Sequence, residues 1–347
     1  MNYPTLSFEN TKEFETTLLK LYKAYGVVVI TNVFTPEYCL EAMDSIVSDI
    51  CSLNSHMNME NLKETWNRDY LPPQTRPGLF QSLCSNFSKV WEIRSNEKVK
   101  FLFSSLYSGL REKKIKHFIV SSDGINIKPA FQDPVGKVKD WAHLDQGKGN
   151  VFSCIQGQAV LTTTTASFVA TPKSHLYFDK ILELAGVTEG KLNDFVKFKP
   201  AQVKLIKEFL EKEKEIPYQI PIEAPKGSFI VWSSALIHSA RLQTCLEHPT
   251  LEDKWNGWRG IVYVCYRPRR EFTDKEIALR KKRVPDNRVT PHWSIGMFPV
   301  RPGGRWSDTQ KPYSEEMEVL LKNPKLVYEK IKKVELTKEQ KELAGLL

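Results

Sequence analysis

Two short stretches of the 347-residue chain carry side chains that are suited to holding a metal ion. The first is Trp141-Ala142-His143-Leu144-Asp145, in which a histidine and a carboxylate stand two positions apart. The second contains a single histidine, His238, after the apolar run 229–232. In a strand, side chains at i and i+2 point to one face, so His143 and Asp145 can reach one ion together. Two imidazoles and a carboxylate on one face of a ferrous ion leave its other coordination positions open.

A structural interpretation of the same residues competes with the metal site. A His-x-Asp pattern arises readily by chance in a chain with seven histidines, and a buried imidazole often simply hydrogen-bonds a carboxylate. His238 taken alone is typical of a core histidine. Arg259 adds weight to a functional site, because it stands at the head of the apolar run 260–266. A guanidinium that enters a core needs a carboxylate partner, from the protein or from a ligand.

The elements that must position these residues begin with helices. Apolar side chains recur at helical spacing in 11–25, 35–50 and 96–110. Gly26 is expected to end the first of these helices, and Thr35-Pro36 to begin the second. Between them, 27–30 is a short β-branched strand.

From residue 117 to residue 266 short β-rich runs follow one another, separated by glycine, proline and polar turns. A series of short strands separated by turns is typical of a β-sandwich or barrel. The predicted strands are 117–121, 125–128, 151–155, 159–164, 168–170, 218–222, 229–232 and 260–266. A helical insert is predicted at 175–185, 190–198 and 201–214, and C-terminal helices at 273–283, 314–333 (broken near Pro324) and 337–347.

The fold class expected from this order is α+β, in one domain that spans 1–347. Residues 1–115 form a helical and strand elaboration, 117–270 the β core, and 271–347 a C-terminal helical extension. The proline-rich segment 71–78 must be a loop, and the longer stretch 66–80 around it is a candidate lid over the site.

The order of these motifs resembles the iron(II)- and 2-oxoglutarate-dependent oxygenases, specifically the phytanoyl-CoA dioxygenase-like family. In that family a W-x-H-x-D, a P-G-S-H segment, a G-D followed by a histidine, and an arginine-headed strand ending in tyrosine occur in sequence. Here they stand as Trp141 to Asp145, Pro172-Lys173-Ser174-His175, Gly227-Ser228 with His238, and Arg259 to Tyr266. The resemblance covers about residues 27–266 and implies a double-stranded β-helix, also called a jelly roll or cupin-like core.

The resemblance assigns roles residue by residue. His143, Asp145 and His238 would be the catalytic, iron-binding triad, and Arg259 would hold the distal carboxylate of 2-oxoglutarate. Asn126 and Ser239 are further candidates for contacts with this co-substrate, although a turn-closing asparagine and an exposed strand serine are the simpler interpretations. His175 is expected to be structural.

Three departures from the family pattern bear on these roles. Lys173 replaces the glycine of a turn, and Ser228 replaces an aspartate. The interval between His238 and Arg259 is also long, because 242–257 resembles an inserted loop. Arg241 and Arg267 therefore compete with Arg259 for the carboxylate.

The activity implied by the resemblance is oxidative decarboxylation of 2-oxoglutarate, with O2, coupled to hydroxylation of an organic substrate. The substrate expected is a small molecule of acyl or nucleotide type. One alternative is a non-catalytic jelly-roll protein that binds a polyanion such as nucleic acid through the basic segment 267–288. Another keeps the fold but uses a different divalent metal for isomerase or hydrolase chemistry.

Composition narrows the remaining possibilities. Hydrophobic residues make up 41% and charged residues 26% of the chain, and no run approaches the ~18 apolar residues that span a bilayer. The N-terminus has no secretory-signal pattern, and the six cysteines include no Cys-x-x-Cys, which favours reduced thiols in an intracellular, cytoplasmic protein. The net charge of +9 permits an anionic partner, but acidic residues are interleaved nearly everywhere and a solvated surface is the simpler interpretation.

Overall fold

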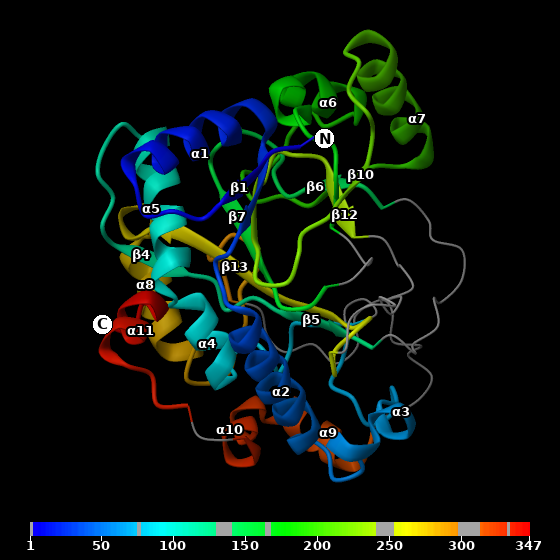
Figure 1. The fold of residues 1–347 in the computed structure, drawn as a ribbon, viewed down its shortest axis with the longest axis vertical. Helices are drawn as coiled ribbons and strands as arrows, with labels where there is room; N and C mark the ends of the chain where they lie inside the picture. Colours follow the sequence, from blue (N-terminus) through cyan, green and yellow to red (C-terminus); the bar gives the residue numbers. More distant parts are fainter. Residues whose placement is uncertain are drawn as a thin grey trace.

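The computed structural model describes residues 3–74, 78–129, 141–163, 168–240, 253–297, 313–331 and 334–347. Within these ranges the chain forms a large and a small β-sheet (Figure 1). The large sheet runs in the order β1 (Thr5–Ser7), β2 (Val27–Thr31), β11 (Phe229–Ser233), β7 (Ile155–Val160), β13 (Arg259–Pro268), β5 (Ile125–Lys128) and β3 (Leu79–Phe80), with β4 (Phe118–Val120) also paired to β13. The small sheet has the order β10 (Ile220–Ile222), β8 (Phe168–Ala170), β12 (His238–Ala240), β6 (His143–Leu144) and β9 (Val196–Lys197).

The central strands pair antiparallel, and β1 with β2 is the parallel exception among the described pairs. Along the chain, β5, β7, β11 and β13 belong to the large sheet, whereas β6, β8, β10 and β12 belong to the small one. The chain therefore crosses repeatedly from one sheet to the other. The mixed α and β class with antiparallel sheets predicted from the sequence is confirmed.

Alternation along the strands shows how the two sheets are packed. On β11, Phe229 and Val231 join the cluster formed with the N-terminal helices, whereas Ile230 and Trp232 join a cluster shared with β8 and β10. Because successive side chains point to opposite faces, this second cluster lies between the sheets.

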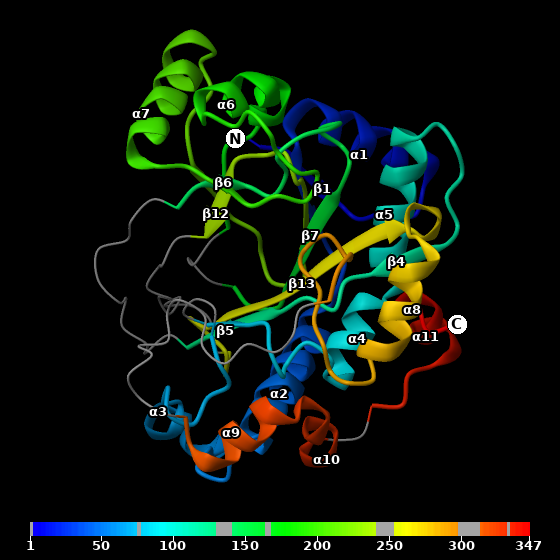
Figure 2. The ribbon, with the colours of Figure 1, turned by 180° about the vertical axis from the view of Figure 1, so that it is seen from behind.

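Helices cover the outer faces of both sheets (Figure 2). Those packed on the large sheet are α1 (Lys12–Tyr25), α2 (Pro36–Ser52), α4 (Ser88–Arg94) and α5 (Glu97–Leu110). The insert helices α6 (Phe178–Leu184) and α7 (Pro200–Glu208) pack on the small sheet. The remaining helices are α3 (Leu62–Thr65), α8 (Asp274–Arg283), α9 (Glu315–Lys322), α10 (Val327–Lys330) and α11 (Lys338–Ala344).

Local signals account for the helix ends. The Thr35 hydroxyl accepts from the Tyr38 N–H at the start of α2, and Asn96 caps α5 in the same way. Gly26 ends α1 with φ +72°. The predicted break at Pro324 separates α9 from α10.

Two sequence predictions are wrong. Residues 190–198 do not form a helix: Val196–Lys197 is strand β9, paired with β6. Gly190 packs so closely on Gly147 that a Cβ at Gly190 would lie 1.9 Å from the Gly147 carbonyl oxygen, and this contact holds the segment beside the sheet. The predicted strands 151–155 and 159–164 are instead a single strand, β7, that runs through Gly157.

Other features agree with the sequence. The cysteines within the described ranges, Cys39, Cys51, Cys84, Cys154 and Cys265, are buried and free, and Cys245 lies outside these ranges. None of the described helices has both the length and the apolar character needed to cross a bilayer.

Candidate metal centre

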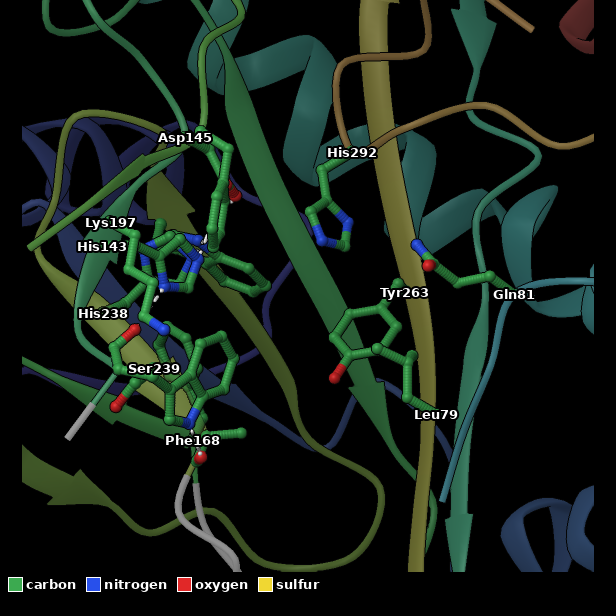
Figure 3. Close-up of a pocket in the computed structure, with 14 residues that line it drawn as sticks. Leu79, Gln81, His143, Asp145, Phe168, Lys197, His238, Ser239, Tyr263 and His292 are labelled. Atoms are coloured by element: carbon green, nitrogen blue, oxygen red, sulfur yellow. Dashed lines mark hydrogen bonds and ion pairs between the residues drawn. The ribbon is translucent and has the colours of Figure 1, made fainter. Parts of the chain in front are cut away.

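Strand pairing brings the predicted triad together. His238 at the start of β12 lies directly opposite His143 on β6 in an antiparallel pair. Asp145 follows β6, and its N–H donates to the Ser234 carbonyl at 3.0 Å. One ligand atom from each of His143, Asp145 and His238 lies within 4.8 Å of the others, and all three side chains are buried (Figure 3).

The spacing of the donor atoms fits a single divalent cation. His143 Nε2 lies 3.5 Å from Asp145 Oδ1, and His238 Nε2 lies 3.4 Å from Asp145 Oδ2. An ion with bonds of about 2.1 Å can join donor atoms that are up to about 4.2 Å apart. Both measured separations fall within that limit.

Backbone contacts prepare both imidazoles as ligands. His143 Nδ1 lies 3.2 Å from the Trp141 carbonyl oxygen, and His238 Nδ1 lies 2.9 Å from that of Leu236. A carbonyl oxygen can only accept a hydrogen bond, so Nδ1 carries the proton in each ring and the Nε2 lone pair is directed at the site. Burial, together with the neighbouring His238, lowers the pKa of His143 to about 3, so this imidazole is neutral at physiological pH.

Asp145 is held from two sides. Gln156 on β7 donates its amide N–H to Asp145 Oδ2 at 2.8 Å, and the Trp293 indole donates to the Asp145 carbonyl at 2.7 Å. Burial opposes ionisation, but the interactions with His143 and His238 outweigh it and hold the pKa of Asp145 below its usual range. The carboxylate is therefore ionised, as a metal ligand must be.

The triad opens into a cavity of about 570 Å³ between the sheets. Aromatic side chains form much of its wall: Trp141, Phe168, Phe195 and Trp232. Figure 3 shows Tyr263, His292, Gln81 and Leu79 on the side of the large sheet, across the open space from the triad. The predicted lid loop contributes at its end, through Leu79, whereas residues 75–77 lie outside the described ranges.

Arg259 is buried at the start of β13. Tyr263 lies on the same face of β13 and lines the cavity, and its hydroxyl interacts with both Arg259 and Asn126. Within the described residues no acceptor satisfies Arg259 Nε, and no donor satisfies the oxygens Asn126 Oδ1 and Gln158 Oε1. A buried guanidinium whose Nε–H has no acceptor fits the carboxylate of a bound acid.

The other candidates for the carboxylate occupy different surroundings. Arg267 also leaves two guanidinium nitrogens, Nε and Nη1, without an acceptor, but its Nη2 pairs with Glu271 at 2.7 Å. It lies over the Trp293 ring, eight positions along β13 from Arg259. Ser239 lines the cavity, but its hydroxyl donates to Gln219 at 2.5 Å. Arg241 lies outside the described ranges.

The turn Pro172–His175 has a left-handed residue, Lys173, at the position where the resemblance would place a glycine. The φ of Lys173 is +70°, in a region that residues other than glycine, asparagine and aspartate rarely adopt. The adjacent His175 is buried against the end of α1, with Nε2 3.0 Å from the Lys23 carbonyl oxygen, which agrees with a structural role.

Tyr263, Gln156 and His292 are residues of the site that the sequence analysis did not identify. Tyr263 had a usable signal, since it stands four positions after Arg259 in a strand and must share its face. Gln156 and His292 had no such signal. The contact of Gln156 with Asp145 follows only from the register of β7, and His292 meets Asp123 across 169 positions of sequence.

Comparison with solved structures supports the fold. The chain is similar to the hypothetical protein JW0805 from Escherichia coli, with 14% identity, coverage of 100% of this chain and 85% of that chain, and a TM-score of 0.56. It is also similar to GlcNAc Inducible Gene 2, GIG2 (DUF1479), from Candida albicans, with 15% identity, coverage of 99% and 80%, and a TM-score of 0.54.

A weaker overlap involves the epimerase SnoN, whose structure was solved in complex with Fe3+, alpha ketoglutarate and nogalamycin RO. Its identity is 11%, its coverage 74% of this chain and 84% of that chain, and its TM-score 0.46. No protein-family model matches the sequence. No curated protein matches it either. The chain therefore shares its overall fold with JW0805 and GIG2, and it carries a buried His-Asp-His cluster with metal-ligand spacing.

Proposed function

We propose that the protein is a non-haem Fe(II)- and 2-oxoglutarate-dependent oxygenase that hydroxylates a small organic molecule. The observation that carries this proposal is the triad itself: two buried imidazoles and one ionised carboxylate, on paired strands, open to a cavity. A two-histidine, one-carboxylate face with open positions is the ligand set of non-haem iron oxygenases.

The proposed scaffold is a double-stranded β-helix. Strands that alternate between a sheet ordered β11-β7-β13-β5 and a sheet ordered β10-β8-β12-β6 support this assignment, because two four-stranded antiparallel sheets joined in this way make a jelly roll. In such a scaffold the triad lies on the small sheet, and the carboxylate-binding residues lie on the large one.

Bound iron and 2-oxoglutarate would supply the oxidising power of the reaction. His143 and His238 would bind the metal through Nε2, and Asp145 through its carboxylate, which Gln156 orients. Trp141, Phe168 and Trp232 would exclude water from the reacting atoms.

Arg259, assisted by Tyr263 and Asn126, is the proposed holder of the distal carboxylate. A carboxylate there would satisfy Arg259 Nε, and rotation of the Asn126 amide would let it donate a hydrogen bond. This role places the co-substrate between β13 and the triad. Ser239 is a weaker candidate, since its hydroxyl proton is already directed to Gln219.

The competing hypothesis is a non-catalytic protein that binds polyanions through 267–288. The burial of two arginines in this segment argues against it. Arg280 is 2% exposed and donates to the carbonyls of Ala344, Ser294 and Val120. Arg267 is 6% exposed and paired with Glu271. Two cations of the segment thus stabilise the fold rather than face a partner.

Succinate formation from 2-oxoglutarate tests the proposal. Purified protein with Fe(II) is expected to form succinate only when O2 is present, and His143→Ala is expected to abolish it. His117→Ala serves as the control, because His117 is exposed and outside the cavity. A well-folded wild-type protein that binds iron but makes no succinate, with or without a panel of organic substrates, would contradict the proposal.

A further inference from the structure

His292 stands in the cavity opposite the triad and is held there by a buried carboxylate. Its Nδ1 forms a short contact with Asp123 Oδ2, and the Asp123 side chain is 1% exposed. A buried aspartate needs a cation nearby, and His292 is its only ion-pair partner within the described residues. The imidazole itself is 30% exposed and lines the cavity.

The segment that carries His292 is fixed on both sides. Thr290 pairs with Ser122 through two hydrogen bonds of 2.9 and 3.0 Å, next to Asp123. On the other side, the Trp293 indole donates to the Asp145 carbonyl, and the Ser294 hydroxyl donates to the Cys265 carbonyl at 2.5 Å. The ring is therefore positioned before any ligand arrives, which reduces the entropy lost on binding.

The charge state of His292 follows from its surroundings. Burial alone would lower its pKa, but the neighbouring carboxylate of Asp123 outweighs this and raises the pKa to about 10. With Nδ1 donated to Asp123, the Nε2–H remains, and no other group of the described chain accepts from it. It is a charged donor facing the cavity.

The rest of the cavity wall suits an anion with an apolar body. Asp145 is the one acidic side chain in the described lining, and the proposed metal would neutralise it. Lys197, opposite His143 on β9, adds a second cation at the rim. Phe168, Phe195 and Trp232 add apolar surface to the same wall.

We propose that the Asp123–His292 pair is the anchor for a carboxylate or phosphate group of the substrate, which is an anionic molecule with an aromatic or aliphatic body. The inference rests on the proposed function, since it names the substrate class of the same cavity. It assigns a specificity role to His292, in the loop after α8, and leaves Arg259, at the start of β13, for the co-substrate.

Anion binding to the loaded protein tests the proposal. Phenyl phosphate, benzoate and the neutral benzyl alcohol are titrated calorimetrically into anaerobic protein that holds Fe(II) and saturating 2-oxoglutarate. The two anions are expected to bind at least about tenfold more tightly than the alcohol, since a charge-assisted hydrogen bond is involved. His292→Gln is expected to remove this preference, His292→Lys to retain it, and His117→Gln, the matched control, to leave it unchanged.

A second measurement follows the wild-type protein itself and uses the His292 variants only to assign the signal. In protein labelled with 15N-histidine, the imidazole signal that is absent from either His292 variant is expected to shift when phenyl phosphate is added. Binding that is equal in wild type and His292→Gln, the absence of anion preference, or displacement of the anions by 2-oxoglutarate would each overturn the proposal.

The same titrations on metal-free protein separate this inference from the proposed function. If iron and 2-oxoglutarate fail to bind but the anions still bind in a His292-dependent manner, the oxygenase proposal alone is wrong. If iron and 2-oxoglutarate bind but the anions show no dependence on His292, the anchor alone is wrong.

Discussion

Gln156 joins Asp145, the proposed metal ligand, to the large sheet through a hydrogen bond. Replacing it with leucine keeps the volume but removes the hydrogen bond that orients the carboxylate. We expect metal affinity to fall about 10- to 100-fold, as is typical when such a supporting partner is lost. Competition with a chelator would measure this.

Gln158→Leu is the matched control for that experiment, because Gln158 lies two positions along β7 and has no contact with Asp145. Its metal affinity should match that of the wild type. Equal metal affinity in the wild type and Gln156→Leu would show that Gln156 does not support the ligand.

His292 also makes stability depend on pH. Its pKa is about 10 in the folded protein, because of Asp123 first and then of Asp145 and Cys265, against about 6.5 when unfolded. The folded state then holds more protons between these values, so its stabilising contribution is complete below pH 6.5 and is lost as pH rises toward 10. Denaturant titrations of the wild type should show this decline, and those of His292→Gln a smaller one.

An identical decline in both proteins would contradict the Asp123–His292 ion pair. His117→Gln is the control, since His117 is exposed and is expected to leave the wild-type profile unchanged.

At the scale of residues, the sequence predicted the three candidate ligands but not the residues that hydrogen-bond or face them. His143, Asp145 and His238 were identified because residue type, spacing and motif order all concern those positions. Gln156 is a strand glutamine like many others until β7 is placed beside Asp145. Asp123 and His292 lie in separate loops, and nothing local indicates that they meet.

At the scale of elements, β13 separates Arg259, the arginine that the sequence favoured for the carboxylate, from its competitor Arg267. Arg259→Lys keeps the charge but loses the planar fork, so we expect the dissociation constant of 2-oxoglutarate to rise about tenfold or more. Arg267→Lys is the paired control and should bind 2-oxoglutarate as the wild type does, because Arg267 pairs with Glu271. The reverse pattern would reassign the carboxylate to Arg267.

The junction of α1 and β2 is expected to be sensitive to a single methyl group. Gly26 has φ +72°, and a Cβ there would lie 2.4 Å from His175 Nδ1. Gly296 has a similar φ of +73° but no atom near the equivalent position. Both alanine variants should lose about 1–2 kcal/mol from the unfavourable backbone, and Gly26→Ala should lose more because of the clash.

Denaturant unfolding of the two glycine variants measures the difference. Equal losses would show that His175 moves aside at no cost and does not fix the turn.

Elements with strong terminal signals were predicted well. Thr35-Pro36, Asn96 and Gly26 act within one turn of the chain, so the sequence fixes where those helices begin or end. The prediction failed at 190–198, where pairing with β6 overrides the helical spacing of apolar residues. That error concealed Lys197, which β9 places opposite His143.

At the scale of the whole molecule, function depends on the space between two sheets whose strands are far apart in sequence. β13 pairs with β4, β5 and β7, and so collects the polar residues of the large-sheet wall. Short β-rich runs predicted a sandwich or barrel, but strand spacing alone could not give the order of the strands. The resemblance in motif order supplied that expectation, and the alternation between sheets agrees with it.

Anaerobic titration of the metal-free protein with Fe(II) and then with 2-oxoglutarate tests the central claim most directly. We predict one iron per chain and, only after 2-oxoglutarate is added, a visible metal-to-ligand charge-transfer band. His143→Ala should lose both iron and band, whereas Arg259→Lys should bind iron normally and require more 2-oxoglutarate. A folded wild-type protein that binds no iron, or that binds iron but develops no band at saturating 2-oxoglutarate, would contradict the account.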